Sequence, residues 1–169
     1  MRTFAIFDVP GASTTTPSGI NDGGQVVGST FSTDSLIPQP GQHGFLRDSD
    51  GNFFTIDVPG ARGTGAGGIN NAGQIVGGFV DSTGGHGFLD IGGSFTTVDA
   101  PGAVSTTATD INDAGQIVGF FFDNTLTHGF LATSISEVPE PSSLALLCAG
   151  IIGLGILRCH RAPRRCHPG

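Results

Sequence analysis

The sequence predicts an all-β protein built from three copies of one unit, followed by a tail of different composition. Three aligned segments begin at Phe4, Phe54 and Phe95, and each later reaches a His-Gly-Phe-Leu strand at His43, His86 and His128. The Pro-Gly pairs at Pro10, Pro59 and Pro101 step by 49 and 42 residues. The chain has 29 Gly and 10 Pro, and its apolar residues between these turn formers are regularly placed, which indicates ordered short strands and not a disordered tract.

Each unit is predicted to contain four strands separated by turns. A Phe-rich first strand ends at Asp-Val-Pro-Gly or Asp-Ala-Pro-Gly, where proline removes a ladder donor and glycine permits the reversal. A second strand ends at Ile-Asn. Hairpin loops then follow at 21–24, 70–73 and 112–115, whose last glycine is expected to take a positive φ.

The third predicted strand is apolar on both faces. In the third copy Ile117 and Phe121 alternate with Val118, Phe120 and Phe122. Because successive side chains of a strand point to opposite faces, both faces of this sheet are expected to be covered. The His-Gly-Phe-Leu segment supplies the fourth strand of the unit.

Four strands in about 42 residues are typical of a propeller blade, and an open β-solenoid or a prism of three sheets are the alternatives. The β region is placed at 1–136, with repeats at about 4–48, 53–90 and 95–133. Closed propellers have at least about four blades, so three copies suggest a fragment or closure by oligomerisation.

Charge separates the two regions and excludes nucleic acid as a partner. Residues 1–136 contain twelve Asp and only three Arg, with no Lys, and the whole chain carries a net charge of −7. Binding to a phosphate backbone needs a basic stripe, which this region lacks. Basic residues cluster only near the C-terminus, directly after an apolar run, which indicates membrane topology.

The β region offers little that resembles a catalytic or metal site. Equivalent positions of successive repeats are normally far apart, so His43, His86 and His128 are expected to be structural and not a zinc site. The Asp48–Asn52 stretch lacks the EF-hand spacing and is predicted to be a polar hairpin. Without a nucleophile elbow or a phosphate loop, we expect no enzyme, no cofactor and no metal.

The repeated pattern, from Asp-Val-Pro-Gly-Ala through Gly-Ile-Asn and Gly-Gln-Ile-Val-Gly to His-Gly-Phe-Leu, resembles the bacterial extracellular repeats of the HAF family. The resemblance covers residues 4–133, with His-Gly-Phe standing where that family has His-Ala-Phe. It implies an extracellular setting and brings no assigned chemistry.

The tail, residues 137–169, has three parts in a fixed order. A Pro139-Glu140-Pro141 triplet precedes an apolar run at 144–157, which is predicted to form a short transmembrane helix. The arginines that follow are expected to stay cytoplasmic and act as a membrane stop; they are Arg158, Arg161, Arg164 and Arg165.

This order resembles the PEP-CTERM sorting signal of Gram-negative bacteria that make extracellular polysaccharide, a tail also labelled an ice-binding protein C-terminal domain. The resemblance implies recognition near Pro139, Glu140 and Pro141 by an exosortase, a membrane protease, while residues 144–157 lie in the inner membrane. The protein would thus be inserted in the membrane in transit and end at the cell surface or outside the cell.

Two expectations about function follow from these features. The first is a non-catalytic surface or matrix protein, with extracellular polysaccharide as a further partner. The alternative is an extracellular binding module that holds a glycan or calcium through its repeat loops. The first residues lack the apolar core of a secretory signal peptide, which suggests that such a segment, with further repeats, precedes Met1 in the gene.

Overall fold

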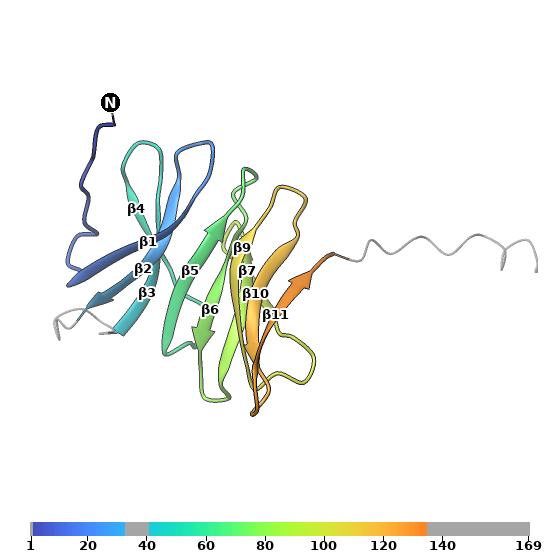
Figure 1. Cartoon of the computed structure of the whole chain (residues 1–169). Coiled ribbons are helices and arrows are strands. Elements are labelled where there is room, and N and C mark those ends of the chain that lie inside the picture. The colour runs from blue at the N-terminus through green and yellow to red at the C-terminus, as the bar shows by residue number, and fades with distance from the viewer. Residues whose placement is uncertain (1, 33–40, 135–169) are drawn as a thin grey trace, which may run out of the picture. The chain divides into compact units, whose positions relative to one another are not determined.

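The computed structural model describes residues 2–32 and 41–134, and its regular structure consists of strands (Figure 1). The strands are β1 (Thr14–Ile20), β2 (Val26–Ser32), β3 (Gly41–Arg47), β4 (Phe53–Ile56), β5 (Gly63–Ile69), β6 (Ile75–Val80), β7 (Gly85–Ile91), β8 (Ser94–Val98), β9 (Ser105–Ile111), β10 (Ile117–Phe122) and β11 (Thr127–Ala132). The all-β prediction is therefore confirmed for these residues. They include no helix long and apolar enough to cross a membrane. The helix predicted at 144–157 lies outside the described residues.

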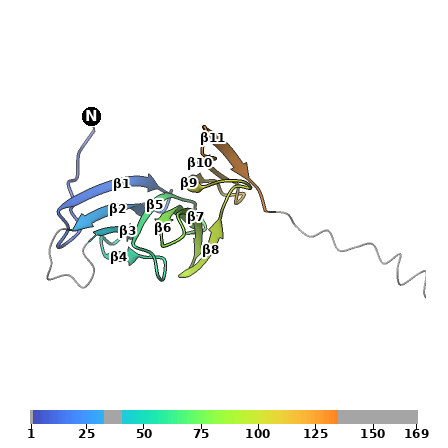
Figure 2. The ribbon, with the colours of Figure 1, turned by 90° about the horizontal axis from the view of Figure 1, so that it is seen from below.

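The strands form a four-stranded antiparallel sheet, β1-β2-β3-β4, which we call the first sheet, and a seven-stranded one (Figure 2). The seven-stranded sheet has two antiparallel parts, β5-β6-β7-β8 and β9-β10-β11, which we call the second and third sheets. The second and third are linked by a single parallel bridge between Gly85 and Ser105. The first strand of the middle sheet, β5, packs against both β1 and β9. Among the described residues the sheets do not close on themselves.

The pairing corrects the predicted order of strands within a unit. The Phe-rich strands β4 and β8 pair with the preceding His-Gly-Phe-Leu strands β3 and β7, so they end a sheet and do not begin one. Residues 48–52 form a short polar hairpin turn between β3 and β4, as predicted for this stretch. Because the turn is so short, it favours antiparallel pairing of the two strands that it joins. The Pro-Gly turn instead carries the chain to the next sheet.

The hairpin loops after the first strand of each sheet are confirmed. The last glycines, Gly24, Gly73 and Gly115, have φ values of 75°, 76° and 75°. In each loop this glycine N–H donates to the carbonyl oxygen of the first Asn, at 3.0 Å in all three. An L-residue would be strained at this φ, so the glycine fixes the turn in every copy.

Two apolar clusters lie between successive sheets. Val27 and Ile56 of the first sheet pack with Ile75, Phe79 and Phe88 of the second. Val76 on the other face of the second sheet packs with residues of the third, which are Ala108, Ile111 and Ile117. The middle sheet thus has apolar contacts on both of its faces, as predicted from the apolar sequence of the strand that is now β6.

The third sheet departs from that prediction. Ile117 of β10 is buried, but Val118, Phe120 and Phe122 on the opposite face are 43%, 46% and 41% exposed. The equivalent residue Val76 is fully buried because the third sheet covers it. Within the described residues no further sheet follows to cover β10, and one apolar face is left open.

Candidate functional site

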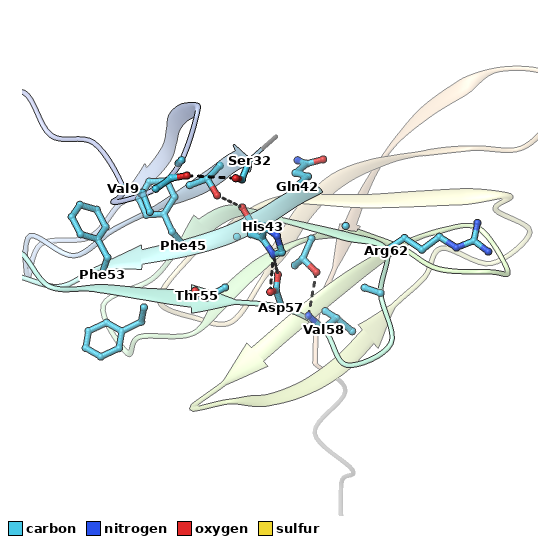
Figure 3. Close-up of a pocket in the computed structure, with 18 of the residues that line it drawn as sticks. Val9, Ser32, Gln42, His43, Phe45, Phe53, Thr55, Asp57, Val58 and Arg62 are labelled. Atoms are coloured by element: carbon cyan, nitrogen blue, oxygen red, sulfur yellow. Dashed lines mark hydrogen bonds and ion pairs between the residues drawn. The ribbon is translucent and has the colours of Figure 1, made fainter. Parts of the chain in front are cut away.

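A cavity of about 810 Å³ lies on the first sheet, bordered by two crossing turns and two strands (Figure 3). The turns are residues 9–12 and 57–62, the two strands are β3 and β4, and the first two residues of β5, Gly63 and Thr64, also line the cavity. Thr30 and Ser32 of β2 form a further part of its wall. We refer to this cavity as the β3–β4 pocket.

One residue in the wall of the β3–β4 pocket differs in size from its equivalents in the other repeats. Thr30 pairs with His43 in the first sheet, whereas Phe79 pairs with His86 and Phe121 with His128. The Phe79 ring lies 5.2 Å from the His86 ring, and the Phe121 ring lies 5.0 Å from the His128 ring. Because threonine is much smaller than phenylalanine, the side chain at this position fills less space beside the histidine in the first sheet than in the other two.

A histidine–aspartate pair stands in the pocket wall. His43 Nδ1 lies 2.8 and 3.0 Å from the two carboxylate oxygens of Asp57, and Figure 3 shows the two side chains pointing toward each other. The pair recurs in the second sheet, where His86 Nδ1 lies 2.7 Å from Asp99 Oδ2. In both cases the aspartate follows the fourth strand of the sheet and the histidine lies on the third.

His86 is held from both ring nitrogens. Its Nε2 lies 2.8 Å from the hydroxyl of Thr83, which in turn donates to Asp81 Oδ1 at 2.6 Å. The hydrogen bond to Asp99 is the main cause that raises the pKa of His86, and the charges of Asp99 and Asp81 add to it. Since the Thr83 proton goes to Asp81, Nε2–H of the protonated imidazole is the donor to Thr83.

This geometry differs from an activated nucleophile in one respect. A catalytic histidine must accept the proton of the hydroxyl, whereas the imidazole here donates to it. The cluster therefore fastens the 81–84 turn to the sheet. His128 is held similarly, with its Nε2 3.1 Å from Asp123 Oδ2. The hydrogen bond from Thr125 leads the causes that lower the pKa of Asp123.

A second row of polar residues joins the three sheets at the ends of β1, β5 and β9. Asn21 Nδ2 donates to the carbonyl oxygen of Asn70 at 3.1 Å, and Asn70 Nδ2 donates to that of Asn112 at 3.1 Å. Asn71 Nδ2 donates to Asp22 and to Asp113, at 2.8 Å in both cases. We call this row the asparagine ladder. The side-chain amides of Asn21, Asn70 and Asn71 donate to other residues of the ladder, which makes it a structural device.

The predicted residues fall on this structure in three ways. The three histidines lie on separate sheets, each beside its own carboxylate. In residues 2–32 and 41–134, no three His, Cys, Asp or Glu side chains gather in a way that could hold a metal ion. The sorting residues Pro139, Glu140 and Pro141, and the four arginines of the membrane stop, lie outside the described residues.

The fold and these contacts define an all-β repeat protein with polar links between its sheets. Residues 137–161 match the family model of the PEP-CTERM protein-sorting motif. The motif implies recognition by an exosortase and export to the cell surface through a membrane-associated step. Searches of curated proteins and of solved structures find no match to the chain.

Proposed function

We propose that the chain is a non-catalytic protein of the cell surface or extracellular matrix, delivered there by its sorting tail. The match of residues 137–161 to the sorting motif carries this proposal. The twelve Asp of the acidic β region suit a solvated surface molecule, and the donor role of His86 toward Thr83 gives no support to hydrolysis. Pro139, Glu140 and Pro141 serve as the recognition triplet for the protease.

Replacing Pro139, Glu140 and Pro141 by alanine is expected to stop processing of the tail. The full chain, fused behind a secretory signal peptide, is expressed in an exosortase-bearing host and in its exosortase deletion strain. The unchanged chain should reach the surface with a shortened C-terminus, while the triple-alanine chain stays intact in the membrane fraction of both hosts. Fractionation and intact-mass spectrometry give both readouts.

Pro168→Ala is the matched control, because it lies outside the matched span of 137–161. It should be processed as the unchanged chain is. Cleavage that persists in the triple-alanine chain, or in the deletion strain, would contradict the assignment of the recognition triplet.

A second candidate function is binding of a glycan in the β3–β4 pocket. The pocket offers an aromatic ring at Phe53 together with polar groups at His43 and Asp57, the combination that sugar rings use for stacking and hydrogen bonding. The calcium part of the alternative is less well supported. The Asp48 carboxylate already accepts from the backbone and side-chain amides of Asn52, at 2.8 and 2.9 Å.

Thr30→Phe is expected to fill the pocket and reduce the affinity for any glycan held there by at least about tenfold, because occluding a well-packed ligand costs more than about 1.4 kcal/mol. Phe79 and Phe121 occupy the equivalent positions, so the fold accommodates this ring. A glycan array identifies the ligand and calorimetry measures its affinity. Thr96→Phe, at an exposed position of β8, is the control and should bind normally. Equal binding by both variants would place the ligand elsewhere.

A further inference from the structure

Residues 4–11 repeat the sequence of the fourth strand and the turn after it. The pattern Phe-x-x-x-Asp-x-Pro-Gly begins at Phe4, Phe53 and Phe95, and the last two of these segments form β4 and β8. The segments also share a contact made just after the strand. The backbone N–H of Val9 donates to Thr15 Oγ1 at 3.0 Å, as Val58 does to Thr64 at 3.1 Å and Ala100 to Thr106 at 3.2 Å.

Phe4–Phe7 therefore precedes the first sheet in the sequence, as β4 precedes the second sheet. The Phe7 ring lies 6.1 Å from the ring of Phe53, which anchors the segment on the first sheet. Unlike β4 and β8, however, it belongs to no sheet among the described residues. Phe4 and Ile6 are 91% and 93% exposed. Among the described residues, this segment has the sequence of a fourth strand but no sheet to pair with.

The third sheet has the complementary vacancy. Its described strands are β9, β10 and β11, and within the described part of the chain β11 pairs with β10 alone. The Phe-x-x-x-Asp pattern begins ten residues after His43 and nine after His86, and the same offsets from His128 fall on Val138 and Glu137, inside the sorting motif. The Phe-x-x-x-Asp pattern does not recur after β11 in the sequence.

The two open sheet faces also complement each other. On the third sheet Leu131 is exposed, beside Val118 and the two exposed Phe of β10. Its equivalent in the second sheet, Leu89, packs against the third sheet. On the first sheet Ile20 is 69% exposed, whereas its equivalents Ile69 and Ile111 are 5% exposed beneath the preceding sheet. Each open face lacks the neighbour that the other would supply.

We propose that a second copy of this chain completes the third sheet, with Phe4–Phe7 of one copy added as a strand to β11 of the other. By the register of β7 with β8, Leu131 faces Ala5 and Gly129 faces Phe7. Asp8 then reaches His128 Nδ1 as Asp99 reaches His86 Nδ1. Main-chain pairing of this kind is strand addition at a sheet edge.

The segment comes from another copy because its own β11 is out of reach. Figures 1 and 2 place the N-terminal segment beside the first sheet and β11 at the far edge of the third. A head-to-tail contact either closes into a ring or continues as a filament. The three sheets described in each copy would make six in a pair, which lies within the about four to eight blades of propellers, so we expect two copies of this chain to close a ring.

Cross-strand cysteines test the register of this contact. Full chains whose three tail cysteines are replaced by serine are mixed in mild detergent, one carrying Ala5→Cys and the other Leu131→Cys. Because directly opposed positions of antiparallel strands bring their Cβ atoms within disulfide reach, oxidation should link the two chains. Ile6→Cys mixed with Leu131→Cys is the control, since a shift of one residue turns the side chain to the other face of the sheet.

Light scattering on the same full chain measures the assembly. The expected mass of the protein component is twice the 17.1 kDa of one chain, and Phe4→Asp with Ile6→Asp should return it to a single chain. Both residues are solvent-exposed within one copy, so the double variant should fold normally by circular dichroism. A monomeric unchanged chain, a filament, or equal linking in the Ile6→Cys control would overturn the proposal.

Discussion

Gly77→Ala is expected to destabilise the protein by about 1–3 kcal/mol, the usual cost of overpacking a core. A Cβ at this position would overlap the carbonyl oxygen of Gly65 and come within 2.7 Å of the Phe88 ring. Phe88 is fully buried and lies between the first two sheets, so neither the ring nor the strand can move away cheaply. The same glycine and ring meet in every copy, as Gly28 with Phe45 and Gly119 with Phe130.

The neighbouring glycine provides the control for this experiment. A Cβ on Gly78 would meet nothing closer than Thr107 Cγ2 at 3.4 Å, which is ordinary contact. Urea unfolding of both variants is followed by far-ultraviolet circular dichroism, since the chain has no Trp or Tyr to report by fluorescence. Equal midpoints for Gly77→Ala and Gly78→Ala would contradict the role assigned to the close approach.

Asn70→Ala is expected to cost about 2–3 kcal/mol of unfolding free energy, because it leaves buried polar groups without partners. Asn70 is 3% exposed. Its Oδ1 accepts the N–H groups of Ala72 and Gln74, while its Nδ2 donates to Gln74 and to the carbonyl oxygen of Asn112. The substitution thus weakens both a hairpin turn and the link between the second and third sheets.

Asn52→Ala tests whether this cost comes from burial. Asn52 also lies in a hairpin and its amide donates to Asp48 at 2.9 Å, but the side chain is exposed. Water can replace that bond, so the expected loss is below about 1 kcal/mol. Hydrogen exchange adds a local readout, because Asn70→Ala should speed exchange at the 70–74 turn. Similar losses for Asn52→Ala and Asn70→Ala would contradict the importance of the asparagine ladder.

Local signals allowed much of the fold to be predicted from the sequence. The Asn-x-x-Gly loops were identifiable because one glycine with positive φ decides the turn, and Gly24, Gly73 and Gly115 all have it. The place of the Phe-rich strand was not identifiable in the same way. Because the unit is repeated, the sequence does not show which of its strands comes first in a sheet. Only the pairing of β4 with β3 shows that the Phe-rich strand is the last strand of its sheet.

The candidate site was predictable only in part. The histidines were expected to be structural, but their aspartate partners were not foreseen. Asp57 and Asp99 stand in Asp-x-Pro-Gly turns, and the turn alone was a sufficient reason for an aspartate at these positions. The β3–β4 pocket has Thr30 and His43 opposite each other in its wall, and this register is known only from the paired strands. The sorting motif is different, since its order of elements can be read directly along the tail.

The single backbone bridge between Gly85 and Ser105 bears on how such a gene can change length. Successive sheets are joined by side-chain packing and a few polar links, and main-chain pairing stays almost wholly within each sheet. Duplication or loss of one whole unit therefore breaks no hydrogen-bonded ladder and presents the same two faces to its neighbours. Recombination can add or remove copies of this module as intact building blocks.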